Sequence, residues 1–218
     1  MIGIVLPMDE EIEAILKYFK CDRTNEIYGI KFLEGKINKK DVIIVKCGIG
    51  KVNAARNTQI LIDNYKIDYV INIGVAGGLK DSKIGDIIVA EKLVQHDFDI
   101  TKFNHELGYI PGVGVYINSS KELVDKCVTL GLKKGIIASG DKFITDMKYS
   151  KMLEEVFDAD AVEMESAAIA QVCYLSNVKF VAIRSISDNP NDNNQVDYVK
   201  FLKSSSNIIA NFINKFIK

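Results

Sequence analysis

Three carboxylates and one arginine in this sequence have the types and spacing needed for acid–base chemistry. Glu163 and Glu165 interrupt a short apolar run, and a second apolar run, Val178–Ile186, is followed closely by Asp188. Arg184 lies inside the second run, where a charge is costly unless it is paired. An arginine in an apolar strand near three carboxylates indicates either a polar site at a sheet edge or a structural ion pair, and these residues alone support both interpretations equally.

The elements that must position these residues follow from the same stretch. The small-residue segment between the two runs, Ser166–Leu175, has the pattern of a helix. The stretch therefore predicts a strand–helix–strand unit with carboxylates at the carboxyl ends of both strands, where open α/β sheets bind ligands. A further acidic group, Asp9–Glu11, begins a predicted helix that extends to Phe19. Acids in a first helical turn also have a purely structural explanation, because the helix dipole favours them there.

Composition excludes several classes of function. The chain has 218 residues, a formal net charge of -1 and scattered lysines, which argues against a nucleic-acid or membrane-binding surface. With only two histidines, His96 and His105, a histidine-rich metal site is not expected, so acid–base chemistry must depend on carboxylates. The N-terminus has no signal-peptide pattern, and four widely spaced cysteines predict reduced core thiols in a cytosolic protein.

The remainder of the chain alternates apolar strand-like runs with helical patterns. This order predicts one domain over residues 1–218, an α/β three-layer αβα sandwich with a mixed, largely parallel central sheet. Glycine-rich or acidic loops, including 74–78 and 139–144, are expected at strand ends. Strands are predicted at 2–6, 28–37, 41–46, 68–73, 86–90, 115–117 and 135–138, and helices at 9–19, 51–65, 119–130, 147–156 and 196–217.

Common nucleotide and hydrolase motifs are incomplete in this chain. Gly48-Ile49-Gly50-Lys51 lacks the full spacing of a phosphate-binding loop, and Gly112–Gly114 does not follow a strand as a dinucleotide fingerprint would. The sequence also has no Gly-x-Ser-x-Gly elbow. Taken together, however, the loops at the strand ends resemble the nucleoside phosphorylase/nucleosidase superfamily, and within it the bacterial 5'-methylthioadenosine/S-adenosylhomocysteine nucleosidases. Seven stretches occur in the family's order: GIVLPMDEEI, CGIGKVNAA, NIGVAGGL, GDIIVA, SGDKFI, AVEMESAAIAQVC and AIRSISD.

The resemblance implies hydrolysis of the N-glycosidic bond of an adenine nucleoside that carries a 5' thioether. Asp188 matches the family's general acid, which protonates adenine N7 and needs a raised pKa for that purpose. Glu11 matches the general base that activates water on the opposite face of the sugar. Glu165 would accept hydrogen bonds from the ribose hydroxyls, and Arg184 would hold Glu165 and the water. No cofactor and no metal are implied.

The resemblance also implies binding roles for less polar residues. Met164 would pack against the sugar, Phe143 would stack on the purine while the Ile144 backbone binds its edge, and Ser187 would orient Asp188. The remaining positions are Ala76 and Gly77, where the backbone approaches the base, Ile49 and Tyr198 around the 5' substituent, and Ile100 and Phe103, which the neighbouring subunit contributes. A homodimer with shared sites is therefore expected.

Several alternatives stay open at this stage. Choosing Glu11 over Glu10 depends on an alignment register of one residue. Glu163 and Glu165 lie on the same side of a strand, so one of them can be structural, and Glu165 is chosen as the functional one. A phosphorylase that uses phosphate in place of water is the second candidate function, although an acidic loop at Glu11 would repel phosphate. A nucleoside-binding protein without catalysis is a third. The 5' substituent is undetermined, because methylthio, homocysteinyl, 5'-deoxyadenosine and aminodeoxyfutalosine substrates share the adenosine half.

Overall fold

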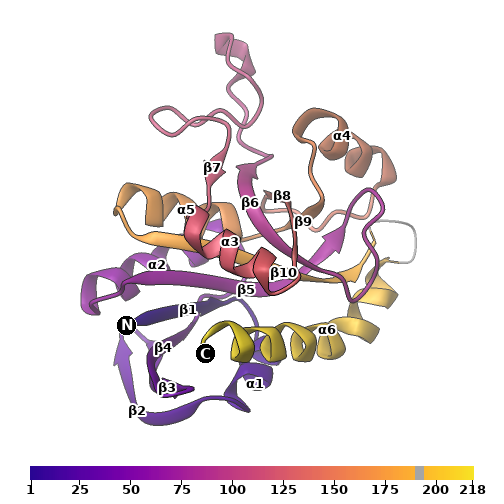
Figure 1. Cartoon of the computed structure of the whole chain (residues 1–218). Helices are drawn as coiled ribbons and strands as arrows, with labels where there is room; N and C mark the ends of the chain where they lie inside the picture. The colour runs from indigo at the N-terminus through magenta and orange to yellow at the C-terminus, as the bar shows by residue number, and fades with distance from the viewer. Residues whose placement is uncertain (190–193) are drawn as a thin grey trace.

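The computed structural model, which describes residues 1–189 and 194–218, is built on one mixed β-sheet (Figure 1). Its strands are β1 (Ile2–Leu6), β2 (Lys20–Ile27), β3 (Ile30–Ile37), β4 (Lys40–Lys46), β5 (Tyr69–Gly78), β6 (Ile87–Gln95), β7 (Ile117–Asn118), β8 (Lys133–Ser139), β9 (Ala161–Glu163) and β10 (Lys179–Asp188). The helices are α1 (Asp9–Leu16), α2 (Lys51–Asn64), α3 (Lys121–Thr129), α4 (Met147–Phe157), α5 (Ser166–Leu175) and α6 (Asn194–Phe216).

The middle of the sheet is parallel, as the alternating pattern predicts. Strands β4, β1, β5 and β10 lie side by side in that order, with Ile4 of β1 opposite Ile44 of β4 and Ile71 of β5. All three side chains are fully buried, so both faces of this part of the sheet must be covered. The predicted hairpin is confirmed as the antiparallel pair β3–β4. The expectation of a mixed α/β fold is thus confirmed.

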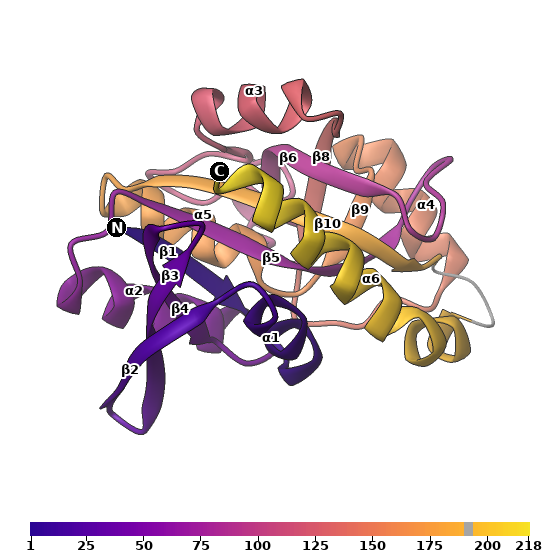
Figure 2. The same cartoon turned by 60° about the horizontal axis from the view of Figure 1, so that its bottom comes forward.

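Helices cover both faces of the sheet in separate layers (Figure 2). Buried residues of α1, α3 and α6 share one apolar core with one face of the strands, and buried residues of α2 and α5 share another with the opposite face. A smaller core joins α4 to the ends of β6, β8 and β9. No helix among residues 1–189 and 194–218 is long and apolar enough to cross a membrane.

Strand β5 changes its neighbour on one side part of the way along, and a short interval between the two neighbours has no strand pairing on that side. It pairs with β1 only as far as Asn72, and on the same sheet path β9 takes over as its neighbour at Gly77 and Gly78. Because β5 also pairs with β10, the strands β5, β9, β8, β6 and β10 form a closed ring. The polar groups of β5 between Asn72 and Gly77 are therefore available to other partners on that side.

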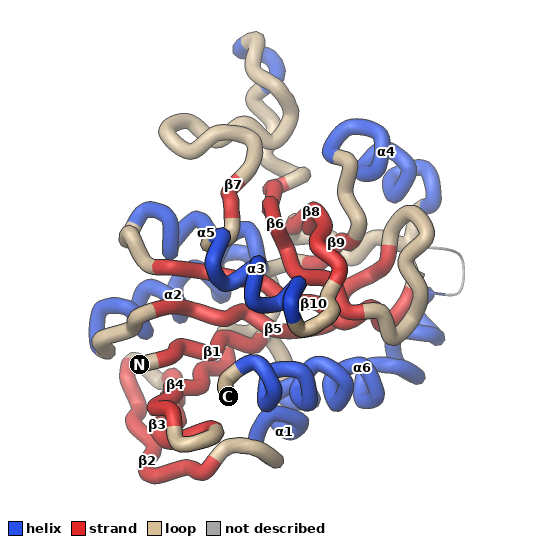
Figure 3. The backbone as a smooth tube through the Cα atoms, viewed as in Figure 1, coloured by secondary structure: helices blue, strands red, loops and turns tan. Residues whose placement is uncertain are grey.

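A long connection between β6 and β7, residues 96–116, projects away from the body of the molecule, and we call it the arm (Figure 3). It contains a short 3₁₀ helix, Thr101–Phe103, and several glycines with positive φ, including Gly108 and Gly112. Gly108 N donates to Phe98 O, which ties the two sides of the arm together near its base. The arm occupies most of the interval between the predicted strands 86–90 and 115–117, for which the sequence predicts no element.

The structure differs from the sequence-based expectations in three places. Residues 74–78 are part of strand β5, so the glycines permit close packing inside a strand and do not form a loop. Helix α1 ends at Leu16, and Phe19 reaches the core from the following turn, which explains its apolar spacing without a longer helix. Strand β2 was not expected, because it lies at the sheet edge with mostly exposed polar side chains and shows no apolar alternation.

Candidate active site

A pocket of about 320 Å³ lies where β5 changes its neighbour. Its walls combine acidic side chains with apolar ones from segments far apart in the chain. The lining residues are Pro7, Met8, Glu11, Ile49, Val75, Ala76, Gly77, Lys142, Phe143, Ile144, Val162, Glu163, Met164, Glu165, Ser187, Asp188 and Tyr198. The fold therefore brings together most of the residues that the sequence singled out, including all three carboxylates assigned to chemistry or sugar binding.

Glu11 reaches the pocket from the first turn of α1 and is almost completely buried. One carboxylate oxygen accepts a hydrogen bond from Val75 N at 3.0 Å, in the interval of β5 between its pairing with β1 and its pairing with β9, and the other accepts one from Met8 N at 3.0 Å. A side chain at Gly74 would approach the Glu11 oxygen to 2.8 Å, so glycine is required there. Burial raises the pKa of Glu11 to about 7, although the Arg184 charge opposes the shift.

Glu163 and Arg184 form a buried ion pair at the wall of the pocket, where Glu163 contributes to the lining. Arg184 is fully buried, and its guanidinium donates to Glu163 Oε2 at 2.7 Å and to Asn72 Oδ1 at 2.6 Å. Glu163 also accepts hydrogen bonds from Ser139 Oγ and from the backbone N–H of Ser166 at the start of α5. Burial alone would raise the pKa of Glu163, but the Arg184 charge and these hydrogen bonds hold it below the usual value.

Glu165 occupies a different environment from Glu163, although only one residue separates them. Its carboxylate lines the pocket and accepts a hydrogen bond from Gly50 N at 2.8 Å. Burial and the nearby Glu163 charge raise the pKa of Glu165 to about 8. The expectation that Arg184 holds Glu165 is corrected by the structure, because the arginine pairs with Glu163, the last residue of β9, and Glu165 lies two residues beyond it.

Asp188 ends strand β10 and is buried. Ser187 Oγ donates to Asp188 Oδ1 at 2.7 Å, which matches the expected contact between the two residues. The register of β10 against β5 shifts between Ile186 and Asp188, so that Asp188 lies opposite Gly77. This irregularity turns the end of the strand toward the pocket.

Apolar and aromatic side chains form another part of the pocket wall. Phe143 and Tyr198 meet edge to face, with ring centroids 5.6 Å apart, and the Tyr198 hydroxyl lies 3.0 Å from Met8 Sδ. Ile49 is half exposed at the rim, whereas Ile144 is buried. Met8 and Lys142 were given no individual role from the sequence, although Lys142 lies in the predicted loop 139–144 and Met8 directly precedes the acidic group Asp9–Glu11.

Three predicted site residues do not line this pocket: Arg184, which is fully buried and paired with Glu163, and two residues of the arm. Ile100 and Phe103 belong to the arm, and the Phe103 side chain is 76% exposed. They do not line the pocket of their own chain. Among the described residues there is no group of three or more His, Cys, Asp or Glu side chains placed to hold a metal ion.

Comparisons with known proteins agree with this geometry. A family model described as the phosphorylase superfamily matches residues 1–218. A 5'-methylthioadenosine/S-adenosylhomocysteine nucleosidase from Bacillus thuringiensis (strain Al Hakam) is 36% identical over 226 residues, which cover 100% of this chain and 98% of the relative.

Solved structures show the same fold. A Helicobacter pylori nucleosidase of that name, complexed with an aminopyrrolopyrimidine ligand that carries a thioether, has a TM-score of 0.95 and 37% identity, covering 99% of this chain and 97% of its own. A futalosine hydrolase of Helicobacter pylori strain 26695 also has a TM-score of 0.95 and 37% identity, covering 99% and 96%.

The buried ion pair generates a prediction for stability. Arg184→Met leaves the Glu163 carboxylate buried without its counter-charge, and we expect this to lower the free energy of unfolding by roughly 3–5 kcal/mol. Urea denaturation measures the change. Lys134→Met is the control, since its partner Glu91 is about half exposed and its loss should cost less than about 1 kcal/mol. Equal effects of the two substitutions would contradict a special role for the buried pair.

The raised pKa of Glu11 predicts a pH-dependent effect on stability. Between its ordinary value of 4.5 and about 7, the folded chain keeps a proton that the unfolded chain releases, so wild-type stability falls as pH rises through this window. Glu11→Gln removes the effect. Its unfolding free energy relative to wild type should therefore rise by on the order of 3 kcal/mol from about pH 4.5 to about pH 8. Glu10→Gln, at an exposed neighbour, should show no such trend.

Proposed function

The chain belongs to the phosphorylase superfamily, and we propose that within it the protein hydrolyses the N-glycosidic bond of 5'-methylthioadenosine and S-adenosylhomocysteine. The products are adenine and the corresponding 5-thioribose compound. The observation that carries the proposal is the convergence of Glu11, Glu165 and Asp188 on one pocket from three separate elements. A pair of carboxylates on opposite sides of a sugar is the arrangement that glycoside hydrolysis needs.

Asp188 is the proposed general acid. Adenine leaves poorly as an anion, so its N7 must be protonated as the bond breaks. The buried position of Asp188 and the hydrogen bond from Ser187 Oγ support this role, because the serine orients the carboxyl group at the pocket wall. Ala76 and Gly77 have little side-chain bulk on the adjacent strand, which lets the purine approach the backbone.

Glu11 is the proposed general base. The sugar becomes oxocarbenium-like, and a water on the face opposite adenine must lose a proton as it attacks. A base works best when its pKa is near the working pH, and the pKa of Glu11 is raised by burial to about 7. Its two contacts to Val75 N and Met8 N hold the carboxylate still while it acts.

Glu165 is the proposed acceptor for the ribose hydroxyls, with Met164 packed against the sugar. Gly50 N fixes Glu165, while the Arg184–Glu163 pair fixes the turn from which Glu165 projects. Arg184 thus supports Glu165 through Glu163 and the backbone N–H of Glu165, which replaces the direct contact expected from the sequence. Phe143 is the proposed stacking partner of the purine, and the Ile144 backbone the group that binds its edge.

The 5' substituent is proposed to lie toward Ile49 and Tyr198. Ile100 and Phe103 would complete this side from a second copy of the chain in a homodimer. Phe103 is exposed on the projecting arm and does not line the pocket of its own chain, which supports a role at the pocket of a second copy. A cytosolic location fits the four free thiols, of which Cys47, Cys127 and Cys173 are buried, while Cys21 is exposed and not in the core as expected.

A second substrate class deserves testing because of one comparison. The Helicobacter pylori futalosine hydrolase resembles this chain as closely as the nucleosidase does. Aminodeoxyfutalosine, like 5'-deoxyadenosine, shares the adenosine half of the substrate that the pocket is proposed to bind. A phosphorylase is less well supported, since Glu11 lines the pocket and, when ionised as the proposed base, would repel phosphate.

The first experiment measures adenine release from 5'-methylthioadenosine by the purified protein, with and without phosphate. We expect adenine and free methylthioribose at a rate that phosphate does not change. A strict requirement for phosphate would instead establish a phosphorylase and remove the role of Glu11. S-adenosylhomocysteine, 5'-deoxyadenosine and aminodeoxyfutalosine, assayed in parallel, rank the 5' substituents by kcat/KM.

The assigned acid and base predict a pattern among variants. Glu11→Gln and Asp188→Asn should each lower kcat by roughly a hundred- to ten-thousand-fold, because each loses its proton transfer. Substrate affinity should change much less, which equilibrium binding to the inactive variants can show. Glu10→Gln is the matched control for Glu11→Gln, and comparing the two also tests whether Glu10 or Glu11 is the base. Full activity in Glu11→Gln together with loss in Glu10→Gln would show that the register is wrong.

A further inference from the structure

Three charged residues from separate segments bond to one another beside the pocket. Lys51, the first residue of α2, donates from Nζ to Asp97 Oδ1 at 2.6 Å. Asp97 Oδ2 accepts from Asp141 N at 2.9 Å, and Asp141 Oδ1 accepts from Lys51 N at 2.8 Å. The three residues form a closed set of contacts, which we call the bracket. It joins the end of β6, the start of α2 and the connection between β8 and α4.

The bracket caps helix α2 from outside. The N-cap residue of α2 is Gly50, which has no side chain to accept the free N–H groups of the first turn. Asp141 supplies the missing acceptor from another part of the chain. Gly50 has a φ of 94°, which favours glycine. A Cβ at this position would also lie 3.1 Å from the Asp141 carboxylate, so the absence of a side chain lets Asp141 come close to the start of α2.

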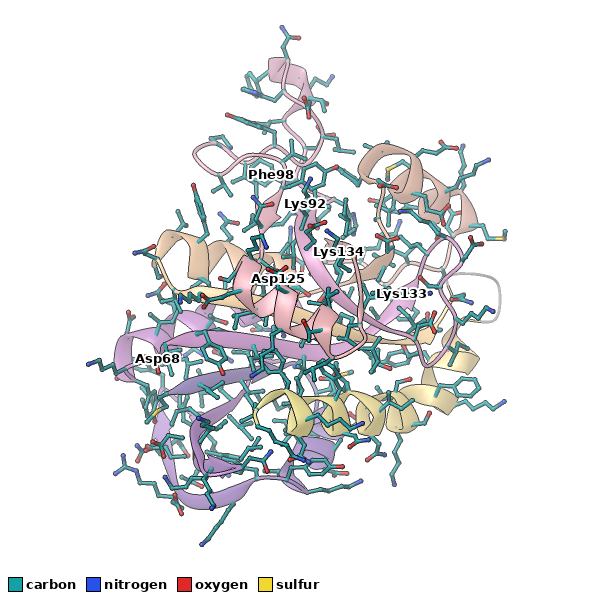
Figure 4. The ribbon with its side chains drawn as sticks, viewed as in Figure 1. Asp68, Lys92, Phe98, Asp125, Lys133 and Lys134 are labelled. Carbon is teal, nitrogen blue, oxygen red and sulfur yellow. The ribbon has the colours of Figure 1, made fainter. Side chains whose placement is uncertain are left out.

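Both ends of the bracket continue directly into the pocket. Gly50 N, one residue before Lys51, donates to Glu165, and Ile49 precedes it at the rim. Phe143 and Ile144 follow Asp141 closely in the chain and also line the pocket. Asp97 lies next to Phe98, which Figure 4 places at the base of the arm. The bracket therefore connects the arm to the two rim loops.

The surroundings make the ion pair in the bracket less solvated than a surface pair. The side chains of Lys51 and Asp97 are 18% and 27% exposed, compared with 56% and 46% for the pair Lys134–Glu91. Gln95 Oε1 lies 3.2 Å from Lys51 Nζ, and its amide nitrogen donates to Gln171 of α5 at 2.6 Å. Burial alone would raise the pKa of Asp97, but the bonds from Lys51 and Asp141 N hold it below the usual value.

We propose that Lys51 and Asp97 are positioning residues for the reaction, which hold Gly50 N against Glu165 and the Phe143–Ile144 loop against the purine. The inference rests on the proposed function. Neither residue lines the pocket, so each acts through the loops that the bracket joins. An error of about 1 Å in such loops can cost a hundred-fold in rate, because binding groups must be aligned before the chemical step.

The bracket also has a consequence for the pH dependence of the reaction. The N–H of Gly50 acts to lower the pKa of Glu165, against burial and Glu163, which raise it to about 8. If Gly50 shifts away, the pKa of Glu165 rises and the ionised form that binds ribose requires a higher pH. The other titratable or charged groups that face Glu165 are Glu163 of β9, Arg184 of β10, Glu11 of α1, Cys47 after β4 and Tyr198 of α6.

Asp97→Asn tests the proposal with little change of shape. An amide has one acceptor oxygen, whereas Asp97 uses both carboxylate oxygens for different donors, so one bond of the bracket must be lost. We expect kcat/KM for 5'-methylthioadenosine to fall roughly ten- to a hundred-fold. The acidic limb of the kcat/KM–pH profile, which reports groups of the free enzyme, should move to higher pH.

A matched pair at Asp141 separates positioning from general damage. Only Oδ1 of Asp141 accepts a bond in the bracket, so Asp141→Asn can keep it and should behave like wild type. Asp141→Ala has no side-chain acceptor for this bond, and it should show the same fall in kcat/KM as Asp97→Asn. Glu91→Gln, which breaks the exposed Lys134 pair from the same strand β6, is the control for charge removal and should leave both kcat/KM and the pH profile unchanged.

Hydrogen exchange supplies a result that does not depend on turnover. In Asp97→Asn, amides at Gly50 and across residues 139–146 should exchange faster, while those of β1 and β5 stay protected. The proposal would be overturned if Asp97→Asn kept wild-type activity, the same acidic limb of the kcat/KM–pH profile and unchanged exchange at these amides. Absence of adenine release by wild type would instead contradict the proposed function, while faster exchange in the variant would still establish the bracket.

Discussion

The ion pair between Arg184 and Glu163 is the constraint on which the site depends. A fully buried guanidinium is costly unless its charge is paired, and here Glu163 supplies the counter-charge while Asn72 and the Ile183 carbonyl accept further hydrogen bonds from the terminal nitrogens. The same carboxylate accepts the first N–H groups of the segment that leads into α5. One interaction therefore joins β10, β9, β5 and α5, and it holds Glu165 at the pocket by fixing the turn beside it.

The change of neighbour along β5 explains why the pocket lies where it does. A strand that pairs with β1 and later with β9 has an interval whose backbone groups need other partners, and Glu11 satisfies one of them through Val75 N. Glycine at position 74 makes room for that carboxylate. Burial in this interval is also the main cause of the raised pKa of Glu11, so fold and acid–base chemistry have a common physical origin.

Much of this arrangement was predictable from the sequence, for reasons tied to particular residues. The apolar runs at β1, β5 and β10 predicted a mixed α/β sheet, and the acids near their ends predicted where polar groups would gather. Strand β2 was not predictable, because an exposed edge strand leaves no apolar period. The glycines of β5 are typical of a loop, and local composition cannot show that Gly74 lies against the Glu11 carboxylate or that Gly78 packs against Ile186 and Ser82.

The amino-acid pattern alone predicts the kinds of element, the burial of Arg184 and the acids near the strand ends. The environment of each acid follows only from the fold. Glu163 and Glu165 are two residues apart and chemically identical, yet one is paired with Arg184 and has a lowered pKa, while the other faces the pocket with a pKa of about 8. The reason is that burial and charge at a carboxylate depend on residues distant in the chain, here Arg184 and Gly50, which meet the two glutamates only after folding.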